Sequence, residues 1–202
     1  TGIFPKSREE EVPHGQLDML LCAQCGLVQL ADTPDPSLLF GESYGYRSGL
    51  NPKMQQHLAE IAKQAQQFVE LAPADLIIDI GSNDGTLLEY FPAACNRVGV
   101  DPLVSKFRGF YQTGLTGMPE FFKSAIAMFY ALQDPVQFLK DVAGVLAYDG
   151  VFILELAYLP EMIRVNAFDG ICHEHLTYWG LSQIERALTD TALRYSSFSI
   201  ND

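Results

Sequence analysis

Residues 76–85 read LIIDIGSNDG, a short apolar run that passes directly into a loop with two glycines. An apolar run of this length that ends in a glycine turn predicts a buried parallel strand over Leu76–Ile80. Gly81 and Gly85 carry no Cβ, so the backbone of this loop can pass close to a ligand. The stretch therefore predicts a strand, a ligand-binding loop and a helix around Thr86–Tyr90.

The chain beyond this loop alternates short apolar runs with helical patterns. We expect further strands at Arg97–Val100, Ala125–Tyr130 and Val151–Leu156, and a helix over Val136–Leu146 that opens after an Asp-Pro pair. Strands that alternate with helices imply a parallel sheet covered on both faces. The fold class predicted from these patterns is α/β.

One stretch is short for such a domain. A helix, a strand and a second helix are expected between Asp101 and Ala125, and only 23 residues lie between them. Either one of these elements is lost, or residues of a mobile segment are missing from the sequence. We favour the second explanation.

Composition and charge bound the classes of function. The chain has 202 residues, of which 48% are hydrophobic, and a net charge of −12. This length holds one packed domain and a small module. The acidic charge argues against a nucleic-acid partner, which would require a basic face. No apolar run reaches the roughly 18 residues of a membrane span, and the N-terminal residues do not resemble a signal peptide. We expect a soluble, cytoplasmic protein of open oligomeric state that binds neither nucleic acid nor membrane.

The glycine loop and an acid further along the chain indicate a nucleotide. Asp101 lies 20 residues after Gly81, where a carboxylate at a strand end accepts hydrogen bonds from ribose hydroxyls. The alternative is an ordinary glycine turn followed by a surface aspartate, but strand, loop, helix and spaced acid together favour the nucleotide. The G-x-G-x-x-G and G-x-x-x-x-G-K-[ST] patterns for dinucleotides and phosphates are absent.

S-adenosylmethionine (SAM) matches this loop best. It has no phosphate and carries a sulfonium cation, which tolerates an acidic loop. Asn83 and Asp84 are expected to face the amino and carboxyl ends of its amino acid. The predicted cofactor-binding residues are Asp79, Gly81, Ser82, Asn83, Gly85 and Asp101.

Two cysteines near the N-terminus have the spacing of half a zinc knuckle. Cys22-Ala-Gln-Cys25-Gly26 places two thiolates on one side of a tight turn. Zinc requires four ligands, a second pair is not visible, and His14 is nearby but unpaired. Two unligated thiols are therefore an equal alternative. A redox pair is less favoured, because the motif does not open a helix after a thioredoxin-like strand.

A histidine cluster follows the last predicted strand. Residues 168–179 read FDGICHEHLTYW, with Glu174 between His173 and His175. Histidine moves protons near neutral pH, and such enzymes hold substrate at the carboxyl edge of a parallel sheet. The spacing is not the H-E-x-x-H of metalloproteases, and a solvated turn is the alternative. A second polar and aromatic cluster, Tyr44–Ser48, is expected to close over the same pocket or, taken alone, to be a packing turn.

Six segments together resemble one family, the sugar C-methyltransferases that act on nucleotide-linked keto-deoxysugars. They occur in family order between Leu20 and Trp179. The segments are CAQCGLVQL (22–30), SYGYRSGLNPKMQQHL (43–58), DIGSNDGTLL (79–88), GVDP (99–102), AIAMFYALQDPVQFLKDV (125–142) and FDGICHEHLTYW (168–179). The resemblance implies a Rossmann-like class I methyltransferase sheet, a small N-terminal zinc-type module and a C-terminal domain.

The resemblance also implies a domain division. It predicts a partial zinc-binding module over 1–52, a connecting helix over 53–71, a SAM-binding domain over 72–160 and the start of a C-terminal substrate domain over 161–202. The family holds zinc with two CxxC pairs, and Cys22 and Cys25 match only the second. The chain is therefore expected to be a fragment with an incomplete zinc site. Cys172 departs from better-known relatives, which carry a tyrosine there that is thought to contact the sugar.

The resemblance assigns roles to the histidine cluster. A ketone at sugar C4 acidifies the C3 proton, a base removes it, and the enolate carbon attacks the SAM methyl group. His175 is the implied base, Glu174 orients it or a sugar hydroxyl, and Tyr46 and His173 stabilise the enolate oxygen. The alternatives are an O- or N-methyltransferase for another small molecule, and a non-catalytic binding protein with the same fold.

Overall fold

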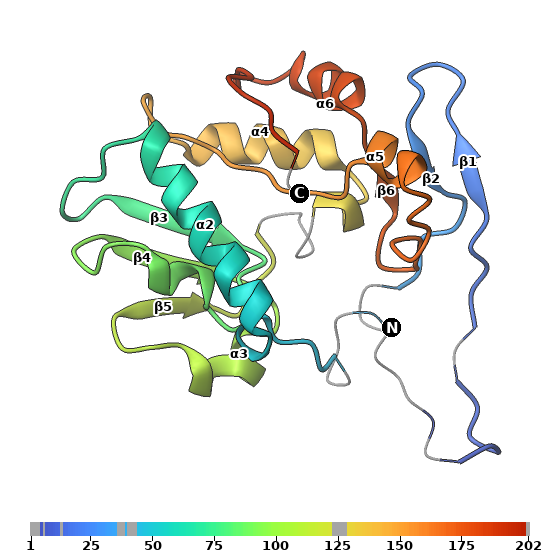
Figure 1. Ribbon diagram of the computed structural model, residues 1–202, viewed down its shortest axis with the longest axis horizontal. Coiled ribbons are helices and arrows are strands. Elements are labelled where there is room, and N and C mark those ends of the chain that lie inside the picture. The colour runs from blue at the N-terminus through green and yellow to red at the C-terminus, as the bar shows by residue number, and fades with distance from the viewer. Residues whose placement is uncertain are drawn as a thin grey trace.

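The structure is a computed structural model with two three-stranded sheets, in the orders β3-β4-β5 and β1-β2-β6 (Figure 1). The first sheet lies in the middle of the chain. The second joins strands from near its two ends. The residues that the structure describes are 5, 7–12, 14–35, 39, 44–122 and 129–200.

The first sheet is parallel and consists of β3 (Leu76–Ile80), β4 (Asn96–Val100) and β5 (Leu115–Met118). At its carboxyl edge Ile80 pairs with Val100, and Val100 pairs with Met118. The loops that follow β3 and β4 therefore meet at one edge. The two strands predicted at 76–80 and 97–100 are confirmed, and the parallel sheet fits the predicted Rossmann-like α/β class.

Two helices confirm the predictions from helical patterns. The first, α2 (Pro52–Phe68), begins after Asn51, whose side chain accepts a hydrogen bond from the Lys53 amide at 2.9 Å. It crosses the parallel sheet in Figure 1 and packs against η2 (Leu87–Tyr90). This η2 is a 3₁₀ helix where an unspecified helix was predicted.

The second confirmed helix, α4 (Pro135–Val145), begins at Asp134, whose carboxylate accepts a hydrogen bond from the Gln137 amide at 2.8 Å. Its apolar face packs in a cluster with Phe129 and Trp179. The helix also contacts α6 (Leu181–Leu188). None of the helices in the described parts of the chain is long and apolar enough to cross a membrane.

Two predicted strands differ in the structure. In the first, residues 125–128 lie outside the described residues, and Phe129 and Tyr130 belong to the 3₁₀ helix η4 (Phe129–Ala131). The second, Val151–Leu156, is wrong as a strand, because no ladder forms along 151–157 within the described chain.

The period of the second run was nevertheless right. Phe152, Leu154 and Leu156 are half-buried against the α4 cluster, whereas Val151 and Ile153 are exposed. The segment runs as an extended coil near α4 and β3 in Figure 1. Apolar alternation predicts an extended chain with one buried face, but a strand also requires hydrogen bonds from a neighbour.

The short stretch after Asp101 contains two of the three elements expected there. These are the single-turn helix α3 (Val104–Phe107), continued by η3 (Arg108–Phe110), and the strand β5. From β5 to Phe122 the chain forms no second helix.

The second sheet joins distant parts of the chain. The hairpin of β1 (Met19–Leu21) and β2 (Val28–Leu30) is antiparallel, and β2 pairs with β6 (Thr177–Tyr178). Figure 1 shows the hairpin beside β6 and α5 (Leu159–Arg164). This pairing, which the sequence did not predict, holds the histidine cluster against the N-terminal module.

Candidate active site

A cavity of about 100 Å³ lies between the glycine loop and the histidine cluster. Six predicted site residues line it, and they come from four separate parts of the chain. These residues are Tyr46, Gly81, Asn83, Asp101, Glu174 and His175. Small-molecule sites span roughly 300–1,000 Å³, so the cavity has to widen before it can hold a nucleoside.

The glycine loop has the left-handed backbone that its sequence predicts. Gly81 has a φ of +81° and Gly85 a φ of +80°, and Asn83 between them is also left-handed at +50°. The Gly81 amide donates a hydrogen bond to the carbonyl oxygen of Val100 at 2.9 Å. A Cβ on Gly85 would lie 3.2 Å from the ring of Tyr111. The loop is therefore tied to β4 and leaves no room for side chains at its glycines.

Asp101 lies at the end of β4 with its carboxylate in the cavity wall. The residue is 3% exposed and accepts hydrogen bonds from the amides of Asn83 at 3.0 Å and Leu103 at 2.7 Å. Burial raises the pKa of Asp101, while the two amides oppose this effect. Each oxygen has a second lone pair, so the carboxylate can also accept from a ligand hydroxyl.

Asp79, in β3, is the second acid near the loop. Burial, and then the negative charge of Asp101, raise the pKa of Asp79 to about 7. A cation bound beside these two carboxyl groups would relieve both effects. SAM carries a sulfonium and an ammonium group, so the acids and the glycine backbone fit this cofactor.

Ser82 supports the loop from below and does not line the cavity. It is 4% exposed, and its hydroxyl shares a hydrogen bond with the Tyr111 hydroxyl at 2.7 Å. A Cβ on Gly99 of β4 would lie 2.5 Å from the Ser82 Oγ. Ser82 therefore packs between the loop and the sheet.

The side chain of Asn83 holds the N-terminal module rather than facing the cavity with free polar atoms. Its Oδ1 accepts a hydrogen bond from the Ser48 amide at 3.0 Å, and its Nδ2 donates to the Tyr46 carbonyl at 3.2 Å. We call the segment Tyr44–Gly49 the strap. Tyr44, Tyr46 and Ser48 of the strap line the cavity, so this cluster lies over the pocket as expected.

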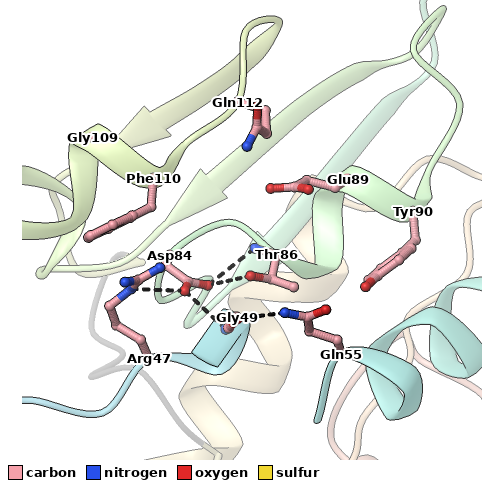
Figure 2. Close-up of a pocket in the computed structure, with 10 residues that line it drawn as sticks. All are labelled: Arg47, Gly49, Gln55, Asp84, Thr86, Glu89, Tyr90, Gly109, Phe110 and Gln112. Atoms are coloured by element: carbon pink, nitrogen blue, oxygen red, sulfur yellow. Dashed lines mark hydrogen bonds and ion pairs between the residues drawn. The ribbon is translucent and has the colours of Figure 1, made fainter. Parts of the chain in front are cut away.

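Asp84 also binds the strap. Figure 2 shows its carboxylate between Arg47, Gly49 and Thr86, with the Thr86 hydroxyl donating at 2.6 Å. The expectation that Asn83 and Asp84 face the two ends of an amino acid therefore does not describe this structure. Their polar atoms are engaged within the protein.

His175 is held in one orientation. Its Nδ1 lies 2.7 Å from the carbonyl oxygen of Gly170, which can only accept, so Nδ1 carries the proton. The neutral ring then has its lone pair on Nε2. Burial alone would lower the pKa of His175, but the hydrogen bond to Cys172 and the charges of Cys172 and Glu174 raise it, with the Gly170 carbonyl.

His173 lies apart from the cavity wall, and its Nε2 is 3.0 Å from the carbonyl oxygen of Gly15. The cluster is thus divided, with Glu174 and His175 at the cavity and His173 against the N-terminal module. Cys172 interacts with His175. Burial would raise the pKa of this thiol, but the hydrogen bond and charge of His175 lower it.

Two tyrosines at the cavity were missed as site residues. Burial, and then the charge of Glu174, raise the pKa of Tyr44 to about 12. Burial also raises the pKa of Tyr130, whose ring centroid is 4.1 Å from that of His175. Both phenols are therefore protonated at neutral pH. Tyr44 belonged to a noted cluster, whereas Tyr130 sits in an apolar run with no local signal.

The cysteine pair forms the turn of the β1–β2 hairpin. The Cys22 amide donates to the Leu27 carbonyl at 2.9 Å, and Gly26 has a φ of +72°. Hydrogen bonds, first from the Cys25 backbone, lower the pKa of the Cys22 thiol. Among the described residues, no group of three or more His, Cys, Asp or Glu side chains could hold a metal ion. The pair offers two of the four ligands that zinc needs, so these residues do not complete a zinc site.

No family model matches the chain. Among curated proteins it is similar to C-methyltransferase NovU of Streptomyces niveus, with 30% identity over 186 residues. The match covers 83% of this chain and 44% of that protein, so the chain spans less than half the length of its relative. Over most of its length, the chain is therefore similar to a protein named as a carbon methyltransferase.

Proposed function

We propose that the chain is part of a SAM-dependent C-methyltransferase that acts on a nucleotide-linked 4-keto-deoxysugar. One observation carries this proposal: the glycine loop with Asp101 faces Glu174 and His175 across a single cavity. An acidic nucleoside site and a proton-transferring histidine are the two parts that carbon methylation needs. The similarity to a C-methyltransferase supports the same reaction class.

The cofactor would be held by the loop and the two acids. Asp101 would accept hydrogen bonds from the ribose, and Gly81 would let the backbone approach the ligand. Asp79 would offset the positive charge. When bound, SAM supplies an electrophilic methyl group.

The chain's own residues would carry the proton. His175, with its proton on Nδ1, would accept the C3 proton of the sugar at Nε2. Glu174 and Cys172 would stabilise the resulting imidazolium. The hydroxyls of Tyr44 and Tyr130, with Tyr46, would donate hydrogen bonds to the enolate oxygen. His173 contacts Gly15 instead, so we no longer assign it to the enolate.

Solvent exchange at the sugar C3 tests this proposal. The protein is incubated with S-adenosylhomocysteine and a dTDP-4-keto-6-deoxyhexose in deuterated water, and deuterium at C3 is measured by NMR. We expect exchange by the wild type, and its loss in His175→Ala with SAM affinity retained. His173→Ala is the matched control and is expected to exchange normally.

The outcomes separate the alternatives. Methyl transfer without exchange in the wild type would indicate an O- or N-methyltransferase. Neither exchange nor transfer would indicate a binding protein. A His175→Ala protein that exchanges as fast as the wild type would remove His175 from the role of base.

Zinc is a separate and narrower proposal. We infer that Cys22 and Cys25 bind zinc only where two further ligands are supplied from outside the described residues. The geometry of the hairpin turn, with the thiol pKa of Cys22 lowered, supports this.

A further inference from the structure

The strap is fastened to the glycine loop by a buried ion pair. Asp84 has a side chain that is 1% exposed, and its Oδ2 lies 3.2 Å from the Arg47 Nε. The same oxygen accepts a hydrogen bond from the Gly49 amide at 3.0 Å. Figure 2 shows these groups meeting beneath the loop. A carboxylate so far from solvent depends on its cation and donors.

Arg47 is held from a second side by an aromatic ring. The centre of its guanidinium lies 3.2 Å from the ring centroid of Phe110 in η3. A planar guanidinium can stack on a ring and donate to a carboxylate in the same geometry, which the point charge of a lysine cannot. The position therefore requires arginine rather than any cation.

Alternate residues of the strap face opposite sides. Arg47 has an extended backbone, with φ −133° and ψ 128°, and extended chains direct successive side chains to opposite faces. Tyr44, Tyr46 and Ser48 line the cavity, whereas Arg47 and Gly49 meet Asp84. Fastening the second set therefore determines where the first set lies.

We propose that Arg47 and Asp84 are positioning residues that hold Tyr46 and Ser48 of the strap over the substrate side of the cavity. This inference rests on the proposed methyl transfer. Because the anchor belongs to the glycine loop, the strap is aligned by the same backbone that would receive the cofactor. The pair acts through the strap and does not itself line this cavity.

The test uses the whole chain and two readouts. The variant Arg47→Lys keeps the charge near Asp84 and removes the planar contact. Arg164→Lys is the matched control, because Arg164 pairs with Glu161 on exposed α5, away from the cavity. Asp84→Asn, which retains an acceptor, is a second variant should Arg47→Lys fold poorly.

The first readout needs no substrate. Hydrogen–deuterium exchange followed by mass spectrometry is expected to show faster exchange of the Ser48 and Gly49 amides in Arg47→Lys, by about tenfold for the loss of a charge-assisted contact. Peptides from β3 and α2 are expected to be unchanged, as is the whole pattern of Arg164→Lys. Unchanged strap exchange in Arg47→Lys would overturn the inference.

The second readout is kinetic. We expect Arg47→Lys to raise the KM for the sugar nucleotide and to lower C3 exchange by about tenfold, with little change in SAM affinity. A loosened strap with wild-type kinetics would show that the pair only stabilises the fold, which would refute the positioning role. If the wild type shows no C3 exchange at all, the proposed function fails, while the amide readout still tests the anchor separately.

Discussion

Replacement of Asp79 by asparagine is expected to stabilise the free protein above neutral pH. Burial, and then the charge of Asp101, raise the pKa of Asp79 from its ordinary value of 3.8 to about 7. The folded protein therefore keeps this proton at pH values where the unfolded chain has lost it. Such a group contributes stability that is complete below pH 3.8 and is lost as the pH rises through 7. Asparagine cannot ionise, so the variant does not lose this contribution.

The magnitude follows from the two pKa values. The interval between 3.8 and about 7 corresponds to roughly 4 kcal/mol in the free energy of unfolding. About 2.5 kcal/mol of this develops between pH 5 and pH 8. The stability of Asp79→Asn relative to the wild type should increase by that amount over this range.

Urea unfolding at pH 5 and pH 8 measures this change. The fluorescence of Trp179, the single tryptophan, reports unfolding because the side chain is buried at 3% exposure. Comparing variant and wild type at each pH cancels the other titrating groups. Asp149→Asn, at an exposed turn, is the control and should show the same difference at both pH values. An equal stability difference for Asp79→Asn at the two pH values would refute the reasoning about its buried carboxyl group.

Three further predictions concern the cofactor, the metal and the loop backbone. Asp101→Ala should bind SAM and S-adenosylhomocysteine clearly more weakly in calorimetry, and unchanged affinity would mean that the ribose carboxylate is misassigned. Metal analysis of the 202-residue chain should find less than one zinc per chain and none in Cys22→Ser; stoichiometric zinc would show that other ligands complete the site. Gly85→Ala should lower thermal stability by about 1–2 kcal/mol, because φ is +80° and the new Cβ would crowd Tyr111. Gly144→Ala, in helix α4 with open space around it, should instead be neutral or stabilising.

The sequence by itself determined the elements whose causes are local. The apolar run at Leu76–Ile80 and the glycines after it predicted β3 and its left-handed loop, because a missing Cβ acts at its own position. Asn51 and Asp134 each begin a helix through a cap within three residues. The spacing from Gly81 to Asp101 placed an acid at the next strand end, because parallel strands of equal length end at one edge.

Only the tertiary structure decided which distant groups meet. Pairing of β2 with β6 holds Glu174 and His175 at the cavity and turns His173 toward Gly15, although the three are adjacent in sequence. The same dependence explains 151–157, where alternation predicted the buried face but only a neighbouring strand could supply a ladder. Asn83 and Asp84 were predicted to face a ligand and instead hold the strap, because the donors that satisfy them lie more than 30 residues earlier in the chain. Hydrogen-bond partners at such separations are selected by packing, which local periodicity and spacing do not encode.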